Sequence, residues 1–255
     1  MDNKQIWETN WEQLGRYSIH SAGNRWAFYL IGLVLKNVQL RPGTKVIDCG
    51  CGIGAKTALL AERFPGNTVY GIDFSQQGIE NSRMYFGDRD NLDFLCIDVH
   101  EISNEVSGSI EMITAFELIE HIGDWKSFLG YICEISQKYI VISTPTGQMR
   151  EYESQLGHYR NFRKGELEEF MKTQGYWPVS VLYAGFPFWS PITRDIYNIM
   201  NTSRKHQNSD RGMEVSFNPI LHGFTFFLYR YLSFRSIGDQ FVGLFEKKEN
   251  IAIQA

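Results

Sequence analysis

The sequence predicts an α/β fold built on a doubly wound, parallel β-sheet. Short apolar runs alternate with helical segments at regular intervals, which is the pattern of strands joined by crossover helices. The first run, at 46–49, leads through a turn with three glycines into a helical segment, and the second run ends in an acid, Asp73. A chain of 255 residues is long enough to bury a substantial core as one such domain with an insertion.

The elements follow from the apolar pattern. Strands are expected at 46–49, 68–73, 92–99, 110–116, 139–145, 177–183 and 240–246. Helices are expected at 25–35, 56–60, 76–85, 125–136 and 163–174, the last ended by Gly175. Between the sixth and seventh strands, an insertion holds a polar linker at 201–211 and an aromatic helix at 221–234. The expected divisions are a helical lid at 1–36, a core at 37–185, a cap at 186–237, and a last strand and tail at 238–255.

Charge and cysteine content limit the partners. The net charge is −4, which argues against nucleic acid as the main partner, because phosphate binding depends on Lys and Arg. The four cysteines lack metal-binding spacing, so we expect reduced thiols that pack in a cytoplasmic protein and no metal site. The polar N-terminal residues show no secretory signal. The aromatic helix is too short to span a membrane, so we expect a cap over a substrate cleft or a homodimer interface, with weak contact to a membrane surface as the less favoured alternative.

The glycine turn is the centre of the predicted site. A sharp strand-to-helix turn often needs positive φ, and glycine also lets a ligand lie against bare backbone. The helix that follows offers free N–H groups and a positive dipole end. Gly50, Gly52 and Ala55 also fit a dinucleotide pattern, so a nicotinamide-dependent oxidoreductase is one alternative. Asp48, before the turn, would repel a pyrophosphate and attract a cationic amino-acid group, whereas Asp73 can accept hydrogen bonds from ribose hydroxyls.

These two motifs resemble those of class I S-adenosylmethionine-dependent methyltransferases of the small-molecule, ubiquinone-pathway-like type, over about residues 40 to 185. The resemblance implies a Rossmann-like, seven-stranded sheet with an antiparallel last strand. It also implies S-adenosylmethionine as cofactor and S-adenosylhomocysteine as product. The cofactor contacts that it implies are Asp48, Cys49, Gly50, Gly52, Gly54, Asp73, Phe74, Ser75, Asp98, Val99 and Phe116. Asp98 would bind the adenine amino group and Val99 the ring; alternatively, Asp98 is a strand-end acid that caps a loop.

The segment 117–121 resembles the E-x-x-E-H segment of such methyltransferases. By that likeness His121 is the general base, Glu120 orients it or binds substrate, and Glu117 completes the catalytic group. Histidine suits this role because its ordinary pKa lies near neutrality. The alternative is that Glu120 and His121 cap the next helix and bind water.

A second segment, His158-Tyr159-Arg160, is similar to the loop that these enzymes place over the substrate. Arg160 could bind an anionic group of the acceptor or could be a structural arginine. Trp7 and Trp11 belong either to a lid over the site or to a staple on the sheet. We expect O-methylation of a small molecule with His121 as the general base, and N-methylation stays open. A catalytically silent cofactor-binding or partner-binding domain is the remaining alternative.

Overall fold

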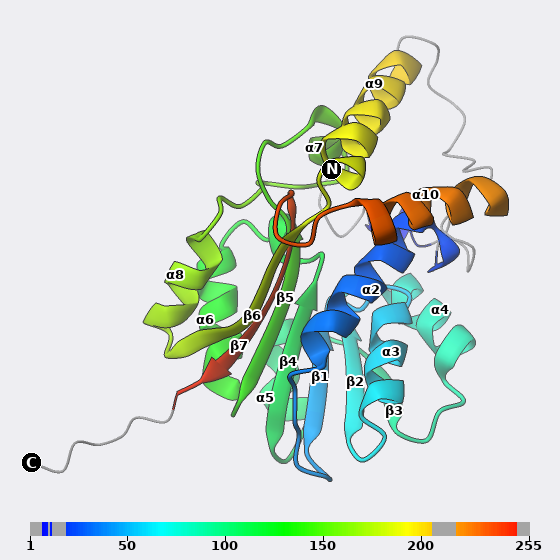
Figure 1. The fold of residues 1–255 in the computed structure, drawn as a ribbon. Helices are drawn as coiled ribbons and strands as arrows, with labels where there is room; N and C mark the ends of the chain where they lie inside the picture. The colour runs from blue at the N-terminus through cyan, green and yellow to red at the C-terminus, as the bar shows by residue number, and fades with distance from the viewer. Residues whose placement is uncertain (1–6, 10, 12–18, 206–217, 249–255) are drawn as a thin grey trace, which may run out of the picture.

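The core is a seven-stranded sheet in the order β3-β2-β1-β4-β5-β7-β6 (Figure 1). A computed structural model describes residues 7–9, 11, 19–205 and 218–248, with the backbone alone at 201–205. The strands are β1 Lys45–Cys49, β2 Thr68–Asp73, β3 Leu92–Cys96, β4 Ile110–Phe116, β5 Tyr139–Pro145, β6 Tyr176–Ala184 and β7 Gln240–Lys247. The first five strands pair in parallel, and β7 is antiparallel to both of its neighbours. The predicted fold class, with its antiparallel last strand, is confirmed.

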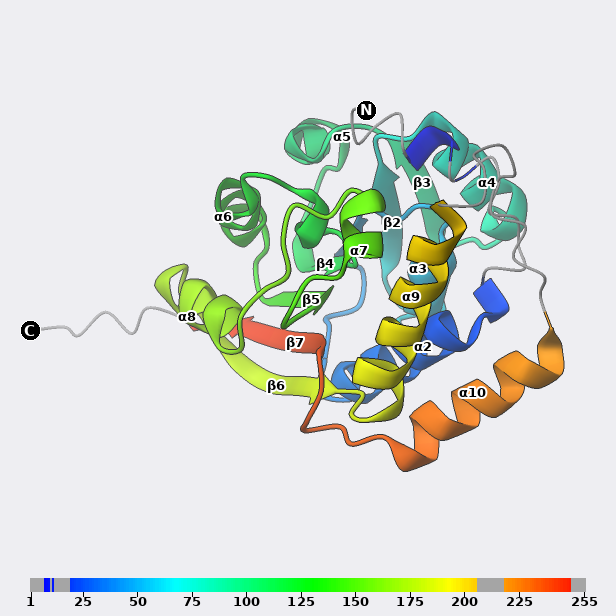
Figure 2. The same cartoon turned by 90° about the horizontal axis from the view of Figure 1, so that it is seen from above.

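Helices cover both faces of this sheet (Figures 1 and 2). On one face, α2 Ala22–Leu35, α3 Ala55–Arg63 and α4 Gln76–Phe86 contribute to one buried apolar cluster. The other face carries α5 Ile102–Glu105, α6 Trp125–Ile135 and α8 Glu166–Thr173 with a second cluster. Continuous burial of β4 and β5 between the two layers explains their unbroken apolar sequences.

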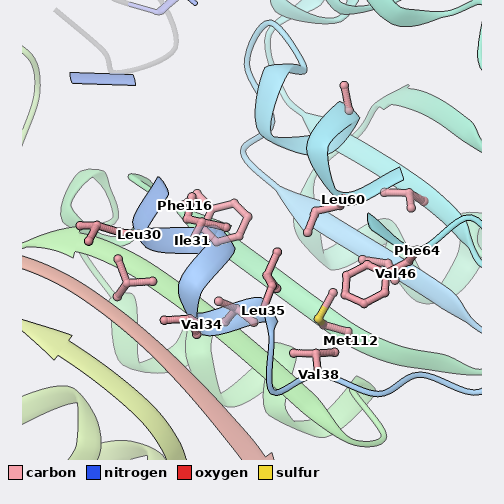
Figure 3. Close-up of a cluster of buried hydrophobic side chains, with 14 of the residues drawn as sticks. Leu30, Ile31, Val34, Leu35, Val38, Val46, Leu60, Phe64, Met112 and Phe116 are labelled. Carbon is pink, nitrogen blue, oxygen red and sulfur yellow. The ribbon is translucent and has the colours of Figure 1, made fainter. Parts of the chain in front are cut away.

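Helix α2 shows why the N-terminal segment belongs to the fold. Ser21 caps it, accepting a hydrogen bond from Asn24 N at 3.2 Å. Its buried residues follow helical spacing, and Leu30, Ile31 and Val34 pack against the sheet in the cluster of Figure 3. The remainder of the expected lid is described only at residues 7–9, 11 and 19–21.

Most element bounds differ from the sequence expectation by up to three residues, and two of the differences have a clear structural reason. The third strand ends at Cys96, because Asp98 caps a 3-10 turn, η2 Val99–Glu101, instead of continuing the strand to Val99. The expected linker begins inside a helix, α9 Arg194–Lys205, so its first five residues are helical, while residues 206–211 lie outside the described residues. Most of the apolar side chains of α9 are exposed. Packing against the core therefore does not determine the sequence of this helix, and we did not predict it.

The insertion consists of three described elements, η4 Phe188–Thr193, α9 and α10 Pro219–Leu232. Helix α10 lies beside α2, and the short α7 Glu151–Gln155 lies beside α9 (Figure 2). Arg194 anchors the start of α9 by pairing with Glu153 of α7 and, at 3.2 Å, with Asp239 just before β7. No helix in the described part of the chain is both long and apolar enough to cross a membrane. The N-terminal residues 1–6 and the tail 249–255 lie outside the described residues.

Candidate active site

All three glycines of the turn have positive φ, as the sequence predicted: +67° at Gly50, +52° at Gly52 and +79° at Gly54. They differ in what surrounds them. A Cβ on Gly54 would lie 2.7 Å from Phe94, so this glycine permits close packing inside the core. A Cβ on Gly50 would lie 2.6 Å from the Leu118 side chain, which places the glycine turn directly against the 117–121 segment.

Asp73 links the two predicted motifs. Its side chain is 8 % exposed at the end of β2, where Oδ2 accepts a hydrogen bond from Gly52 N at 2.9 Å and Oδ1 accepts one from Ser75 N at 2.9 Å. Burial raises the pKa of Asp73, while these backbone hydrogen bonds oppose the rise. Each carboxylate oxygen keeps a further acceptor position. The positive-φ turn and this carboxylate fit a ribose-bearing cofactor.

Asp48 has a different environment from the one that the sequence suggested. Its carboxylate is 1 % exposed and accepts hydrogen bonds from Thr57 Oγ1 at 2.7 Å and Thr114 Oγ1 at 2.6 Å. Burial raises its pKa to about 6. Asp48 therefore ties the start of α3 to β4 beneath the turn, and a direct contact with the cofactor stays a prediction.

The other predicted cofactor residues divide by exposure. Phe74 is 37 % exposed, and Ser75 caps α4 by accepting a hydrogen bond from Gly78 N at 3.0 Å. Asp98 is exposed and accepts a hydrogen bond from His100 N at 2.9 Å, which is the loop-capping geometry of the alternative interpretation. The side chains of two further residues, Cys49 and Phe116, lie in the apolar core, so only their backbone can meet a ligand.

The carboxylates of the 117–121 segment are held by side chains from other strands. Glu117 has a left-handed backbone, with φ of +53°, and its Oε1 accepts hydrogen bonds from Ser143 Oγ at 2.6 Å and Gln240 Nε2 at 2.9 Å. Glu120 is 1 % exposed, with Oε2 2.9 Å from Thr144 Oγ1. Burial and the nearby Glu117 charge raise the pKa of Glu120 well above its usual range.

Sequence reasoning missed Ser143, Thr144 and Gln240, because they lie 24 or more positions away in the chain from the carboxylates they contact.

The two predicted histidines meet in space. The rings of His121 and His158 lie edge to face with centroids 4.5 Å apart, and Tyr159 N donates to Glu120 O at 2.9 Å. Burial, followed by the charge of His158, lowers the pKa of His121 to about 3, and burial lowers that of His158 as well. Both imidazoles are therefore neutral at physiological pH. The structure thus places the loop after β5 against the 117–121 segment.

Arg160 is engaged within the protein. Its Nη2 lies 2.5 Å from Glu166 Oε1, and its guanidinium lies over the rings of Phe162, at 4.7 Å, and Trp125, at 5.3 Å. Tyr159, by contrast, is 62 % exposed. These contacts support the structural interpretation of Arg160, and its role in binding an anionic acceptor stays a prediction.

Glu120, His121 and His158 also have the ligand types of a metal site. Their potential ligand atoms all lie within 4.8 Å of one another, which makes this the candidate position for a cation among the described residues. From the sequence we expected no metal site. Measurement of the metal content of the purified protein tests this expectation directly.

The N-terminal segment lies over the site. The Trp11 ring would be 2.6 Å from a Cβ on Gly52, and the Trp7 ring stacks on it at 5.1 Å while contacting His121 edge to face at 5.0 Å. Glu8 accepts hydrogen bonds at the start of α4, including one from Gln76 N at 2.9 Å. These contacts favour a lid over a remote staple, and sequence analysis gave no sign of Glu8.

Comparisons with known proteins decide the family. A family model described as a methyltransferase domain matches residues 40–185, which is more than half of the chain. The chain belongs to this methyltransferase family. Family membership supports the cofactor that the motifs of the glycine turn and β2 predicted, S-adenosylmethionine, over the nicotinamide alternative.

Sequence relatives are ubiquinone biosynthesis O-methyltransferases. The protein of Idiomarina loihiensis is 31 % identical over 88 residues, covering 34 % of this chain and 35 % of the relative. That of Acinetobacter baylyi is 32 % identical over 89 residues, covering 34 % and 37 %. The chain therefore covers only about a third of the length of these relatives.

Solved structures share the fold at low identity. The Haemonchus contortus phosphoethanolamine N-methyltransferase 2, solved with phosphomonomethylethanolamine and S-adenosylhomocysteine, has a TM-score of 0.57 at 16 % identity, covering 87 % of this chain and 52 % of that one. The [4+2]-cyclase SpnF has a TM-score of 0.57 at 18 % identity, covering 87 % and 80 %. The fold thus also serves a cyclase, so the acceptor and the reaction must be argued from the site.

Proposed function

We propose that this protein transfers a methyl group from S-adenosylmethionine to a hydroxyl group of a small-molecule acceptor. The observation that carries the proposal is the contact between the glycine turn and the 117–121 segment, through Gly50 and Leu118. It brings a proton-accepting group beside the cofactor turn, at the carboxyl edge of the sheet where open α/β folds bind ligands. The O-methyltransferase relatives support oxygen as the acceptor atom.

The bound cofactor supplies an electrophilic methyl carbon on a cationic sulfur. The protein must hold the acceptor oxygen in line with that carbon and receive the hydroxyl proton. Alignment of the two reactants can lower the barrier by ~7–11 kcal/mol, and a positioned base adds a factor of roughly 10²–10⁴. The chain therefore needs an enclosed site and one suitable base.

The pKa shifts of His121 and Glu120 support a different role for each of them in removing the hydroxyl proton. His121 was the expected base, but with a pKa of about 3 it is a weak one, although its neutral ring can accept a hydrogen bond from the acceptor hydroxyl. Burial raises the pKa of Glu120, so its ionised carboxylate binds a proton more strongly than the ring of His121 does. We assign positioning of the hydroxyl to His121 and receipt of its proton to Glu120.

We assign the enclosure of the acceptor to two segments, the N-terminal lid with Trp7 and the loop after β5 with His158. Trp7 contacts His121 from the N-terminal side, and His158 contacts it from the loop after β5. An acceptor that lies against this group of touching aromatic side chains would be shielded from water and held by apolar contact, as small-molecule ligands usually are.

The test measures methyl transfer and cofactor binding separately. The purified protein is given S-adenosylmethionine with a panel of phenols, catechols and amines, and S-adenosylhomocysteine release is followed. Glu120→Gln is expected to reduce turnover by two or more orders of magnitude while leaving S-adenosylhomocysteine affinity unchanged, and His121→Ala is expected to raise KM as well. Glu134→Gln, on the exposed side of α6, is the matched control.

Full turnover in Glu120→Gln would refute the assigned base. Cofactor binding without methyl transfer to any member of the panel would favour the silent binding domain.

A further inference from the structure

Helix α10 is apolar on both of its faces, although it lies at the surface. Its inner side contains Tyr229, which is 2 % exposed, and Phe226, which packs against the core. On its outer side, Ile220 is 83 % exposed, Phe224 59 % and Phe227 49 %. Such spacing forms one continuous stripe along the helix. Exposed apolar stripes of this kind mark interaction surfaces.

The surroundings of this stripe are basic. Residues 19–40 and 218–238, which include α2 and α10, contain four cationic side chains and no Asp or Glu, although the whole chain has a net charge of −4. Three of the cations line the border between the two helices. Arg25 lies 4.1 Å from the ring centroid of Phe226, and Arg230 and Arg235 lie 3.5 and 5.2 Å from that of Tyr29.

This charge pattern discriminates between possible occupants. A two-fold dimer would place the same patch of each copy against the other, so guanidinium groups would face guanidinium groups with no carboxylate to balance them. An anionic surface complements them instead. Helix α10 runs along the outer edge of the molecule, where it can lie on a flat surface without obstruction from the sheet (Figures 1 and 2).

We propose that the outer face of α10 docks on the surface of an anionic lipid membrane. The apolar stripe would enter the headgroup region, while Arg25, Arg230 and Arg235 contact lipid phosphates from its border. The helix would lie in the plane of the interface, consistent with the absence of a membrane-spanning helix from the described residues. This inference does not depend on the proposed methyl transfer.

The test is sedimentation of the full chain with vesicles of phosphatidylcholine, with and without phosphatidylglycerol. We expect binding to the anionic vesicles that weakens as salt is raised. Phe224→Ser with Phe227→Ser should reduce affinity at least tenfold, and Arg235→Gln about fivefold, since one basic residue near such a surface contributes about that factor. Met84→Ser, which changes a residue 70 % exposed on α4, should leave affinity unchanged.

Failure of the unmodified protein to bind anionic vesicles would overturn the proposal. So would vesicle binding that Phe224→Ser with Phe227→Ser leaves intact. Analytical ultracentrifugation of the same variants supplies the remaining outcome: a dimer that these substitutions dissociate would show that a second copy covers the face. Because the substituted side chains are exposed, thermal unfolding should be close to that of the unmodified protein and serves as the folding check.

Discussion

Substitution of Gly54 by Ala tests whether this glycine is required by packing as well as by backbone conformation. At φ of +79°, a residue with a Cβ is disfavoured by about 1–2 kcal/mol. The added Cβ would also lie 2.7 Å from Phe94 and from Ser82 Cβ. Phe94 is 1 % exposed inside the core and cannot move without displacing its neighbours. Such overpacking adds about 1–3 kcal/mol, so we expect Gly54→Ala to lower the free energy of unfolding by about 2–5 kcal/mol.

Gly165 provides the matched control for this prediction. It also precedes a helix, with φ of +85°, but nothing lies within 4 Å of the position of an added Cβ. Gly165→Ala should therefore show the backbone cost alone, about 1–2 kcal/mol. Both variants are compared by urea unfolding at equal slope, so that the shift in midpoint reports stability. Equal losses in the two variants would refute the steric argument at Gly54.

Three further predictions concern charged groups of the site. Burial raises the pKa of Asp48 from 3.8 to about 6, so folding favours its protonated form. Urea unfolding should show the wild type losing about 3 kcal/mol relative to Asp48→Asn as pH rises from about 3 to about 7, and a constant difference would contradict this. Asp73→Asn should weaken S-adenosylhomocysteine binding by about 10- to 100-fold in calorimetry, because a charged acceptor is lost, whereas Asp93→Asn on the exposed side of β3 should not. Dialysis against a chelator should leave turnover unchanged, and tightly bound metal whose removal abolishes turnover would overturn the assignment of Glu120 as proton acceptor.

The strands could be predicted closely because their apolar sequences are set by burial on both faces. The segments 110–116 and 139–145 were predicted with the bounds of β4 and β5, which are buried along their whole length. The third strand was predicted too long, because Ile97 and Val99 are apolar whereas Asp98 between them caps a turn. The alternation of apolar and polar residues cannot distinguish an edge strand from the loop that follows it when both show that alternation.

The site was predictable where its residues are close in sequence and not where the sheet brings them together. The glycine turn, Asp73 and the 117–121 segment each belong to a motif that can be recognised within a few residues of sequence. The carboxylate of Asp48 accepts hydrogen bonds from Thr57 of α3 and Thr114 of β4, which are distant in sequence, so these contacts could not be predicted from the residues around Asp48. The lowered pKa of His121 could not be predicted either. It results from burial and then from the charge of His158, which lies 37 positions along the chain.

The last strand explains how the strained start of the 117–121 segment is maintained. A non-glycine residue at φ of +53° is disfavoured by about 1–2 kcal/mol, so Glu117 needs compensating contacts. Its N–H donates to Ser143 O at 2.8 Å, and its carboxylate accepts hydrogen bonds from Ser143 of β5 and from Gln240 of β7, two strands that pair with each other. Antiparallel insertion of β7 beside β5 is what brings Gln240 to this edge of the sheet. The last strand therefore supports the candidate site as well as the sheet, because Gln240 helps to hold the backbone turn at Glu117, next to the contact of Leu118 with Gly50.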